Sequence, residues 1–471
     1  MTQTQSPSDQ EVIVRTTASS NYLIINKPKN LNSLNNAMIT TIEENLLHWN
    51  NSPSCKNIIV KSSFPKAFSA GGDVVHIAKG TPESFRDNVA FFVDEYKANH
   101  TMGTMKKPVV AIIDGITMGG GVGAAVHFPF RVSTEKTMLA MPETLIGFFP
   151  DVGTSFTLSR LDNNLGMFLG LTGHRLRGKD VYYAGFSTHY IHSSNLQLLE
   201  KRLAMQITDS IDETRAILDS VSELSASLEY SYTLAPYLST INKCFGHRKL
   251  EDIYESLKSE SVHKEWAAKI LNELNRMSPT SLKVSLELFN RARYLSIKEC
   301  LDLEAQVASK IIFSNDFVQG VTELLITKKN NPKWNPQNIY TADYDTIINT
   351  YFSNFNPEYN CNFRNSIDYH DYPFAHHTLP TSDTIIESAI DSNYTFSSTN
   401  NTEKINSIVA KLSKKYHRSA DISAKVSHYL KNYSIVELRD LYLSERNSRN
   451  PNKYFYTNYF KTLTNNQSSK L

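Results

Sequence analysis

The stretch KPVVAIIDGITMGGGVGAAV, residues 107 to 126, joins a short β-rich run to a cluster of glycines and then to small apolar residues. Val and Ile with few polar neighbours are typical of a buried strand, and glycines directly after the strand predict a tight turn. Because glycine lacks a Cβ, the backbone N–H groups of such a turn can converge on one ligand oxygen. A helix that begins after the cluster would add its positive N-terminal end there. The stretch therefore predicts a strand, a turn and a helix around an anion-binding corner.

A second glycine cluster has the same setting. FSAGGDV, residues 68 to 74, follows the β-rich run NIIVKSS, residues 57 to 63. A single glycine run is weak evidence, because close packing against a helix also selects glycine. Two clusters at strand ends, followed by paired acids, favour an oxyanion hole made of backbone N–H groups. Acyl transfer is the reaction class that most needs such a site.

The paired acids are Glu143 and Asp151, eight residues apart in MPETLIGFFPDVGTSF, residues 141 to 156. Carboxylates among apolar neighbours are candidates for nucleophilic or general acid–base work. Two other readings stay open from the residues alone. Glu143 could face solvent after Pro142, and Asp151 could be the N-cap of a helix that begins in VGTSFTLSRL.

Regular patterns outside these motifs predict the layout of the chain. Several β-rich runs alternate with helical patterns in the first third, which predicts an α/β region. Asn and Ser cap candidates precede Leu34, Met38, Ile42 and Leu46, which form one stripe of a helix and indicate core packing. From about residue 195 helical periodicity replaces strands, and KKNNPKWNP, residues 328 to 336, ends it.

Several ordered motifs together resemble the crotonase superfamily, and within it the 3-hydroxyisobutyryl-CoA hydrolase branch. They are KAFSAGGDV, GITMGGGVG, MPETLIGFFPDVG and LTGHRLRGKDVYYAG, and MSPTSLKVSLELF and NPKWNP extend the similarity to about residue 336. The resemblance implies an α/β fold, a crotonase-like spiral of ββα units with a helical C-terminal region, here followed by a fungal-type extension. It also implies an acyl-CoA thioester hydrolase of valine degradation.

The resemblance assigns roles residue by residue. The N–H groups of Gly72 and Gly120 form the oxyanion hole, Glu143 acts as nucleophile or general base, and Asp151 orients the 3-hydroxyl of the substrate. Glu95, in FFVDEYKAN, lines the substrate site, although its helical context alone indicates a surface charge. No metal and no cofactor are implied, since CoA is part of the substrate.

Two positions bear on the reaction. The two-glutamate hydratases of the superfamily carry an acid where this chain has Gly123 in GGGVG, which disfavours hydration. After FPDVG the family commonly has further glycine, whereas this chain has Thr154 and Ser155. These bulkier residues predict a narrower substrate pocket, and with it reduced or shifted activity.

The chain divides into four predicted parts. They are a crotonase-like α/β core with the acyl-CoA site (1–195), a helical region that completes the hydrolase fold (196–340), a linker or docking segment (341–400) and a basic helical tail module (401–471). Ile405, Ile408, Val409 and Leu412 predict one amphipathic helix in the tail, and SIVELRDLYL a second.

The tail is basic whereas the rest of the chain is acidic: residues 401–471 hold 13 Lys and Arg against 5 Asp and Glu, and residues 1–400 hold 36 against 42. Its cations interleave with rings, as RNA-binding segments do; they are Lys411, Lys414, Lys415, Arg418, Lys425 and Lys431 with Tyr416, Tyr429, Tyr433 and YFYTNYFK. Such a tail could equally pack on its own enzyme domain. YPFAHHTLPTSDTI resembles fungal members of the branch, including a mitochondrial small-ribosomal-subunit protein, which implies a mitochondrial location and rRNA or ribosomal small-subunit contact.

Other signals narrow the class of protein. Four cysteines far apart in the sequence fit buried thiols in a reducing compartment. No apolar run is long enough to span a bilayer, so we expect no membrane protein. Three functions are compatible with the sequence. The protein could be a thioesterase or a structural component of the ribosomal small subunit that keeps the hydrolase fold. It could also be a hydratase or isomerase, although Gly123 disfavours this third function.

Overall fold

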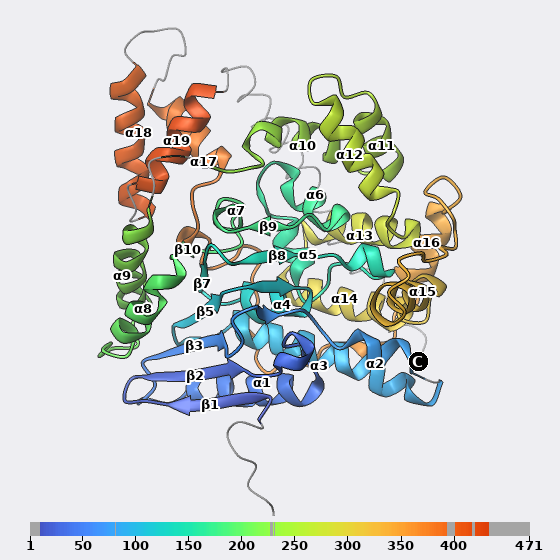
Figure 1. The fold of residues 1–471 in the computed structure, drawn as a ribbon, viewed down its shortest axis with the longest axis horizontal. Helices are drawn as coiled ribbons and strands as arrows, with labels where there is room; N and C mark the ends of the chain where they lie inside the picture. Colours follow the sequence, from blue (N-terminus) through green and yellow to red (C-terminus); the bar gives the residue numbers. More distant parts are fainter. Residues whose placement is uncertain are drawn as a thin grey trace, which may run out of the picture.

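Two sheets form the centre of the molecule in a computed structural model that describes residues 10–80, 82–226, 229, 231–392, 401–416 and 420–432 (Figure 1). The larger sheet has the order β1 (Val12–Thr16), β2 (Ser20–Ile25), β3 (Asn57–Ser62), β5 (Val109–Ile113), β7 (Phe130–Ser133) and β10 (His189–Tyr190). The smaller sheet has the order β4 (Ala67–Ser69), β6 (Ile116–Met118), β8 (Met138–Ala140) and β9 (Leu176–Arg177). Pairing is parallel except at β1–β2 and β8–β9.

The chain builds these sheets as a spiral. Each turn gives a strand to the larger sheet, then a short strand to the smaller sheet, and then a helix: β3, β4 and α2 (Val74–Ala78); β5, β6 and α4 (Gly120–Val126); β7, β8 and the 3-10 helix η4 (Glu143–Ile146). Gly115 makes the turn between β5 and β6 at φ +100°, where a Cβ would lie 2.8 Å from the Lys66 backbone. The predicted spiral of ββα units is confirmed.

Helices cover both faces of the larger sheet. On one face, α1 (Asn36–Asn50) and α3 (Phe85–Gly103) pack on the strands, and Met38, Ile42 and Leu46 of the predicted stripe are buried there. Asn35 caps α1 by accepting a hydrogen bond from the Met38 N–H over 2.9 Å. On the other face, α8 (Leu196–Leu203) and α9 (Ile211–Ser222) bury their apolar sides against Tyr22, Ile59 and Val110. Burial on both faces explains the almost uninterrupted apolar runs of the strands.

Helices make up the region after β10, and no further strand occurs in the described part of the chain. They are α10 (Leu238–Phe245), α11 (Leu250–Lys258), α12 (Lys264–Leu274), α13 (Pro279–Ala292), α14 (Ile297–Ile311) and α15 (Asn315–Val321). They pack with α5 (Thr154–Leu158) and α6 (Leu165–Thr172) of the preceding region, whereas α7 (Lys179–Tyr183) lies against β7, β9 and β10. In particular, α14 lies against α3 and α5, so it reaches the segment that carries Asp151.

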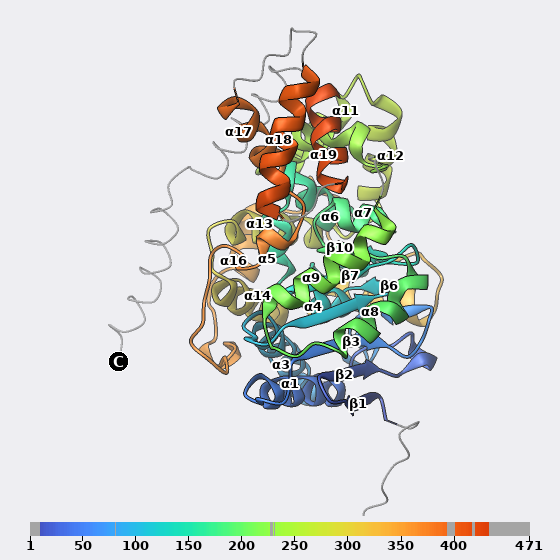
Figure 2. The ribbon, with the colours of Figure 1, turned by 90° about the vertical axis from the view of Figure 1, so that its left-hand side faces the viewer.

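The segment predicted as a linker or docking segment lies on the body of the molecule. After α16 (Tyr344–Tyr351), Arg364 pairs with Glu43 of α1 at 3.0 Å, and Ile367 O bonds to His100 Nε2 at 2.8 Å. Tyr372 Oη donates to Phe128 O over 2.6 Å. The chain then continues into α17 (Ser382–Asp391), α18 (Asn401–Tyr416) and α19 (Ala420–Asn432). These three helices lie beside α6 and α7 (Figure 2).

The first predicted tail helix is α18, with Ile405, Ile408 and Leu412 buried. The prediction that Lys425 and Tyr429 present cation and ring to RNA is wrong, because both side chains are buried in this chain. The apolar positions of α19, which sequence analysis did not single out, turn these two residues inward. Arg418, Tyr433, SIVELRDLYL and YFYTNYFK lie outside the described residues.

Candidate active site

The two glycine clusters meet at the carboxyl ends of β4 and β6. Gly72 follows β4, and Gly120 is the first residue of α4. A Cβ on Gly120 would lie 3.0 Å from Gly72 N, so the two backbones are in close approach. Within the described chain, neither the Gly72 nor the Gly120 N–H donates a hydrogen bond to another residue. The corner therefore holds two neighbouring amide donors that are available to a ligand, and one begins a helix.

Glycine is needed at this corner for two separate reasons. Gly71 and Gly119, which precede the two donor residues, have φ +111° and +50°, which L side chains rarely adopt. A Cβ on Gly121 would lie 2.4 Å from Ser69 O, so α4 packs directly on β4. Close packing between α4 and β4 therefore requires glycine here, as one reading of the sequence proposed. The same glycines also form the anion-binding corner.

Two glutamates from different elements face this corner. A Cβ on Gly120 would lie 2.6 Å from Glu95 Oε1, and a Cβ on Gly119 would lie 2.7 Å from Glu143 Oε1. Glu95 comes from α3 and Glu143 begins η4. The other oxygen of Glu143, Oε2, and Glu95 Oε1 are buried without a hydrogen-bond partner among the described residues. These oxygens are therefore available to a substrate.

Asp151 joins the same group through α3. Tyr96, next to Glu95, donates a hydrogen bond to Asp151 Oδ2 over 2.8 Å. Glu95, Glu143 and Asp151 are 4%, 6% and 5% exposed, so the solvent-facing reading of Glu143 is wrong. The N-cap reading of Asp151 is wrong as well, because α5 begins after Gly153 and bonds only the Asp151 carbonyl. All predicted site residues thus lie in one buried cluster.

Burial sets the protonation of these acids. Desolvation, followed by repulsion from Asp151, raises the pKa of Glu143 and of Glu95 well above the ordinary value. Desolvation also raises the pKa of Asp151, to about 7, while the Tyr96 hydrogen bond lowers it. No Lys or Arg in the described chain forms an ion pair with any of the three. Asp151 therefore ionises before the two glutamates, and perturbed acids of this kind are typical of catalytic sites.

The loop that carries Asp151 is held in a strained conformation. Val152 has φ +53°, which is unfavourable for a β-branched residue. His127 Nε2 bonds to Val152 O at 2.7 Å, and Glu304 of α14 accepts from Gly153 N at 2.7 Å and Ser155 N at 3.2 Å. Ser155 Oγ also donates to Glu304. Desolvation raises the pKa of Glu304 to about 8. His127, directly after α4, and Glu304 of α14 thus fix the loop on both sides.

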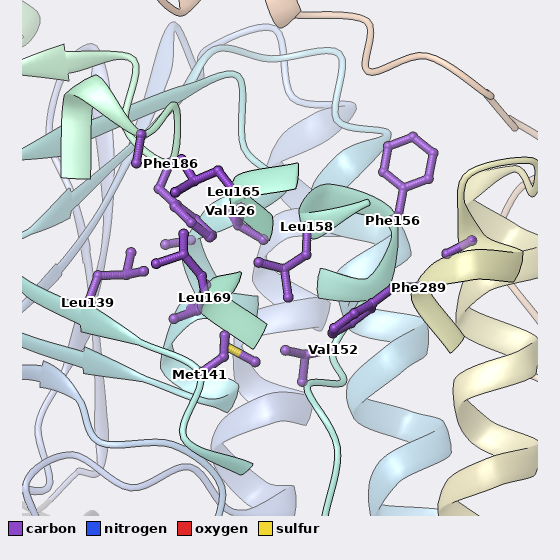
Figure 3. Close-up of a cluster of buried hydrophobic side chains, with 14 of the residues drawn as sticks. Val126, Leu139, Met141, Val152, Phe156, Leu158, Leu165, Leu169, Phe186 and Phe289 are labelled. Carbon is purple, nitrogen blue, oxygen red and sulfur yellow. The ribbon is translucent and has the colours of Figure 1, made fainter. Parts of the chain in front are cut away.

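The strain of Val152 has a consequence at Gly123. Val152 packs in the apolar cluster that includes Met141, Leu158 and Phe289 (Figure 3). A Cβ on Gly123 would lie 2.5 Å from Val152 Cβ. The space beside Gly123, where the hydratases carry their second acid, is therefore filled by a valine side chain. No carboxylate could extend from position 123 into the site with this loop conformation.

Thr154 and Ser155 are fully buried, and their hydroxyls bond within the protein. Thr154 Oγ1 donates to Asp151 O over 2.7 Å, and Ser155 bonds to Glu304 as described above. The two side chains fasten the loop through these bonds. The narrower pocket expected from them stays a prediction.

Sequence analysis missed Tyr96, His127 and Glu304. Tyr96 and Glu304 lie in helices whose patterns indicate packing, and their partners are 55 and 151 residues away in the chain. The only feature of the sequence that could have pointed to Tyr96 is its position directly after Glu95 in a helix with many apolar residues. Nothing in the local sequence separates Glu304 from an ordinary helix-surface glutamate.

Comparisons with known proteins identify the family of the chain. The family model described as enoyl-CoA hydratase/isomerase matches residues 20–352. The small ribosomal subunit protein mS47 of Neurospora crassa is 39% identical over 391 residues, which cover 79% of this chain and 77% of that protein. Human mitochondrial 3-hydroxyisobutyryl-CoA hydrolase is 38% identical over 345 residues, 73% of this chain and 89% of that protein.

Solved structures give the same fold. A carnitinyl-CoA dehydratase from Mycobacterium thermoresistibile superposes with a TM-score of 0.68 at 31% identity, covering 76% of this chain and 100% of that one. An enoyl-CoA hydratase from Rhodobacter sphaeroides superposes with a TM-score of 0.64 at 27% identity, covering 73% and 97%. The mitochondrial location expected from the sequence agrees with the names of the curated hydrolases of Xenopus laevis and human, which are given as mitochondrial. No helix among the described residues is long and apolar enough to cross a membrane.

Proposed function

The chain belongs to the enoyl-CoA hydratase/isomerase family, and we propose that it hydrolyses the thioester of 3-hydroxyisobutyryl-CoA to free CoA and 3-hydroxyisobutyrate. The observation that carries this proposal is the meeting of two unpartnered amides, at Gly72 and Gly120, with the buried carboxyl groups of Glu143 and Asp151. Curated relatives with the name of this hydrolase support the choice of substrate.

In the proposed reaction, the thioester carbonyl oxygen accepts hydrogen bonds from the N–H groups of Gly72 and Gly120. These donors stabilise the negative charge that develops on this oxygen in the tetrahedral intermediate. Glu143, once ionised, either bonds to the carbonyl carbon or takes a proton from a water that does so. When the C–S bond breaks, CoA leaves as thiolate and takes up a proton. In the first route water then hydrolyses the mixed anhydride and frees Glu143.

Asp151 and Glu95 are assigned to the acyl group. Ionised Asp151 would accept a hydrogen bond from the 3-hydroxyl of the substrate and hold the carbonyl in register with the two amides. Glu95, whose protonated form is favoured by burial and by the Asp151 charge, would line the same pocket without adding a second negative charge. The filled space beside Gly123 argues against hydration, which in this superfamily uses two acids.

The test compares Glu143→Gln with wild type in release of CoA from 3-hydroxyisobutyryl-CoA. Loss of a nucleophile or base predicts a fall in kcat of ~100-fold or more. Glu44→Gln is the matched control, because Glu44 is exposed on α1. Near wild-type turnover by the Glu143→Gln protein would remove Glu143 from the mechanism.

A second candidate function is a structural role in the mitochondrial ribosomal small subunit, with or without turnover. Similarity to the Neurospora small-subunit protein runs over 391 residues, further than the 345 shared with the human hydrolase, so it favours a role for the extension. Lys411, Lys414 and Lys415 of α18 are exposed and could meet phosphates of rRNA. Retained acids in a buried cluster favour activity in either setting.

Sedimentation of mitochondrial extract, with CoA release assayed across the gradient, tests this role. Co-migration of protein and activity with the small subunit would support both functions together, whereas protein found only in free fractions would contradict the ribosomal role. The same gradient with the protein lacking residues 401–471 tests the tail. Unchanged co-migration would show that the tail is not the ribosomal contact.

A further inference from the structure

A cavity of about 380 Å³ lies away from the acyl-CoA site, where the extension meets the core. Residues from the segment α5 to α7 line it together with residues of α18 and α19. Val126, Phe156 and Leu165, labelled in Figure 3, give it an apolar portion. Its volume falls within the ~300–1,000 Å³ of small-molecule sites. None of Gly72, Glu95, Gly120, Glu143 or Asp151 lines it.

Two buried cations line this cavity. Arg131 of β7 is 3% exposed and Lys425 of α19 is 5% exposed. Arg131 donates only to neutral oxygens, those of Phe186, Phe128 and Tyr372, over 2.7 to 3.0 Å. Within the described chain, neither cation has a carboxylate at ion-pair distance, and the Lys425 amine makes no hydrogen bond. A buried charge without a partner costs free energy, so a bound anion would relieve both sites.

Among the described residues that line the cavity, the one acid, Asp162, is already hydrogen-bonded. Asp162 accepts hydrogen bonds from Ser382 N at 2.6 Å and Ser382 Oγ at 2.7 Å. These bonds fix the start of α17 and leave its carboxylate outside ion-pair distance of Lys425. Burial lowers the pKa of Lys425 and the Asp162 charge raises it. Lys415, exposed on α18, adds a further cation at the edge.

Aromatic rings complete the lining. Tyr372, Tyr416 and Tyr429 line the cavity together with the two cations, and the Lys425 amine lies 5.8 Å from the ring centre of Tyr429. Rings beside cations suit a ligand that has both a planar group and a phosphate, because each recognises one part of it.

We propose that this cavity is a second binding site, for a small phosphate-bearing ligand with a planar ring, of the size of a nucleoside monophosphate. Lys425 binds the phosphate, Lys415 adds positive charge at the edge, and the tyrosines bind the ring. The site exists only where α18 and α19 pack on the core, so occupancy ties the extension to the core. This proposal is independent of the thioesterase chemistry.

Calorimetric titration of the full-length protein tests the proposal with UMP, inorganic phosphate and uridine as probes. Saturating CoA is present in each titration, so that the acyl-CoA site is blocked. We expect UMP to bind more tightly than phosphate, and phosphate more tightly than uridine. Lys425→Met should weaken UMP binding at least ~10-fold, since hydrogen bonds to charged groups contribute ~1.5–3 kcal/mol. Lys414→Met is the matched control, because Lys414 is exposed on α18 and does not line the cavity.

Thermal unfolding separates binding from folding. Without ligand, Lys425→Met should unfold at the wild-type temperature or above, because it removes an uncompensated buried charge. With UMP, only wild type and Lys414→Met should gain stability. Absence of binding by both UMP and phosphate, or equal UMP binding by wild type and Lys425→Met, would overturn the site. Equal affinity for UMP and phosphate would overturn its assignment to a ring-bearing ligand.

Discussion

Tyr96 donates a hydrogen bond to Asp151 over 2.8 Å, and the two residues approach the site from opposite sides, one on α3 and the other on the strained loop before α5. Ionised Asp151 accepts this bond most strongly, so the bond lowers a pKa that burial raises to about 7. The contact therefore sets the charge of the group that would orient the substrate.

Tyr96→Phe removes that donor, and the pKa of Asp151 should rise above its present value. A smaller fraction of Asp151 is then ionised near pH 7, so kcat/KM should fall there by ~3–10-fold and recover as the pH rises, because one pKa unit is a tenfold change. The measurement is the pH profile of kcat/KM. Tyr340→Phe, at an exposed tyrosine, is the control. An equal loss at every pH would contradict an electrostatic role.

The raised pKa of Glu143 makes a prediction about stability. A carboxyl group whose pKa is higher in the folded than in the unfolded state stabilises the fold at low pH, and this contribution is lost as pH rises towards the folded pKa. Glu143→Gln has no proton to lose. Its unfolding temperature relative to wild type should therefore be higher near pH 8 than near pH 5, whereas Glu44→Gln should show no such trend. A pH-independent difference would contradict burial as the cause.

Glu304 offers a test of how the loop is fixed. Glu304→Ala leaves the buried N–H groups of Gly153 and Ser155 without an acceptor, at a cost of ~1–3 kcal/mol for each group. We expect lower stability and, because Asp151 loses its position, a fall in kcat. Glu304→Gln keeps one acceptor and should recover part of both. If Glu304→Ala lowers stability but leaves kcat and KM unchanged, the residue supports the fold without positioning Asp151.

The sequence predicted the structure correctly where the local order of residue types determines it. The strand, turn and helix of residues 107–126 follow from apolar runs and glycines, and the motifs identified the family and both amide donors. Local patterns fail for Glu95, which lies beside Gly120, and for Lys425, whose burial depends on α19 packing on the core. Contacts between different elements of the fold decide both positions.

Gly123 and Val152 form a pair that a double mutant can test. Gly123→Ala places a Cβ 2.5 Å from Val152 Cβ and should destabilise the protein by ~1–3 kcal/mol. Val152→Gly opens that space and relieves the strained φ. The combination Gly123→Ala with Val152→Gly should therefore be more stable than the sum of the two single effects predicts. Additive effects in urea unfolding would contradict direct contact between the two positions.

Labelling with heavy-oxygen water distinguishes the two roles left open for Glu143. If Glu143 bonds to the acyl carbon, water attack on the anhydride at the Glu143 carbonyl transfers a labelled oxygen to that carboxyl group over repeated turnovers. If Glu143 only takes a proton from water, the label enters the released acid and never the protein. Mass spectrometry of the peptide that contains Glu143 reads the outcome. The buried Glu143, next to the Gly119–Gly120 corner and with Oε2 unpartnered, favours direct attack, so we expect labelled peptide. An unlabelled peptide after many turnovers, with label only in the released acid, would contradict water attack at the Glu143 carbonyl.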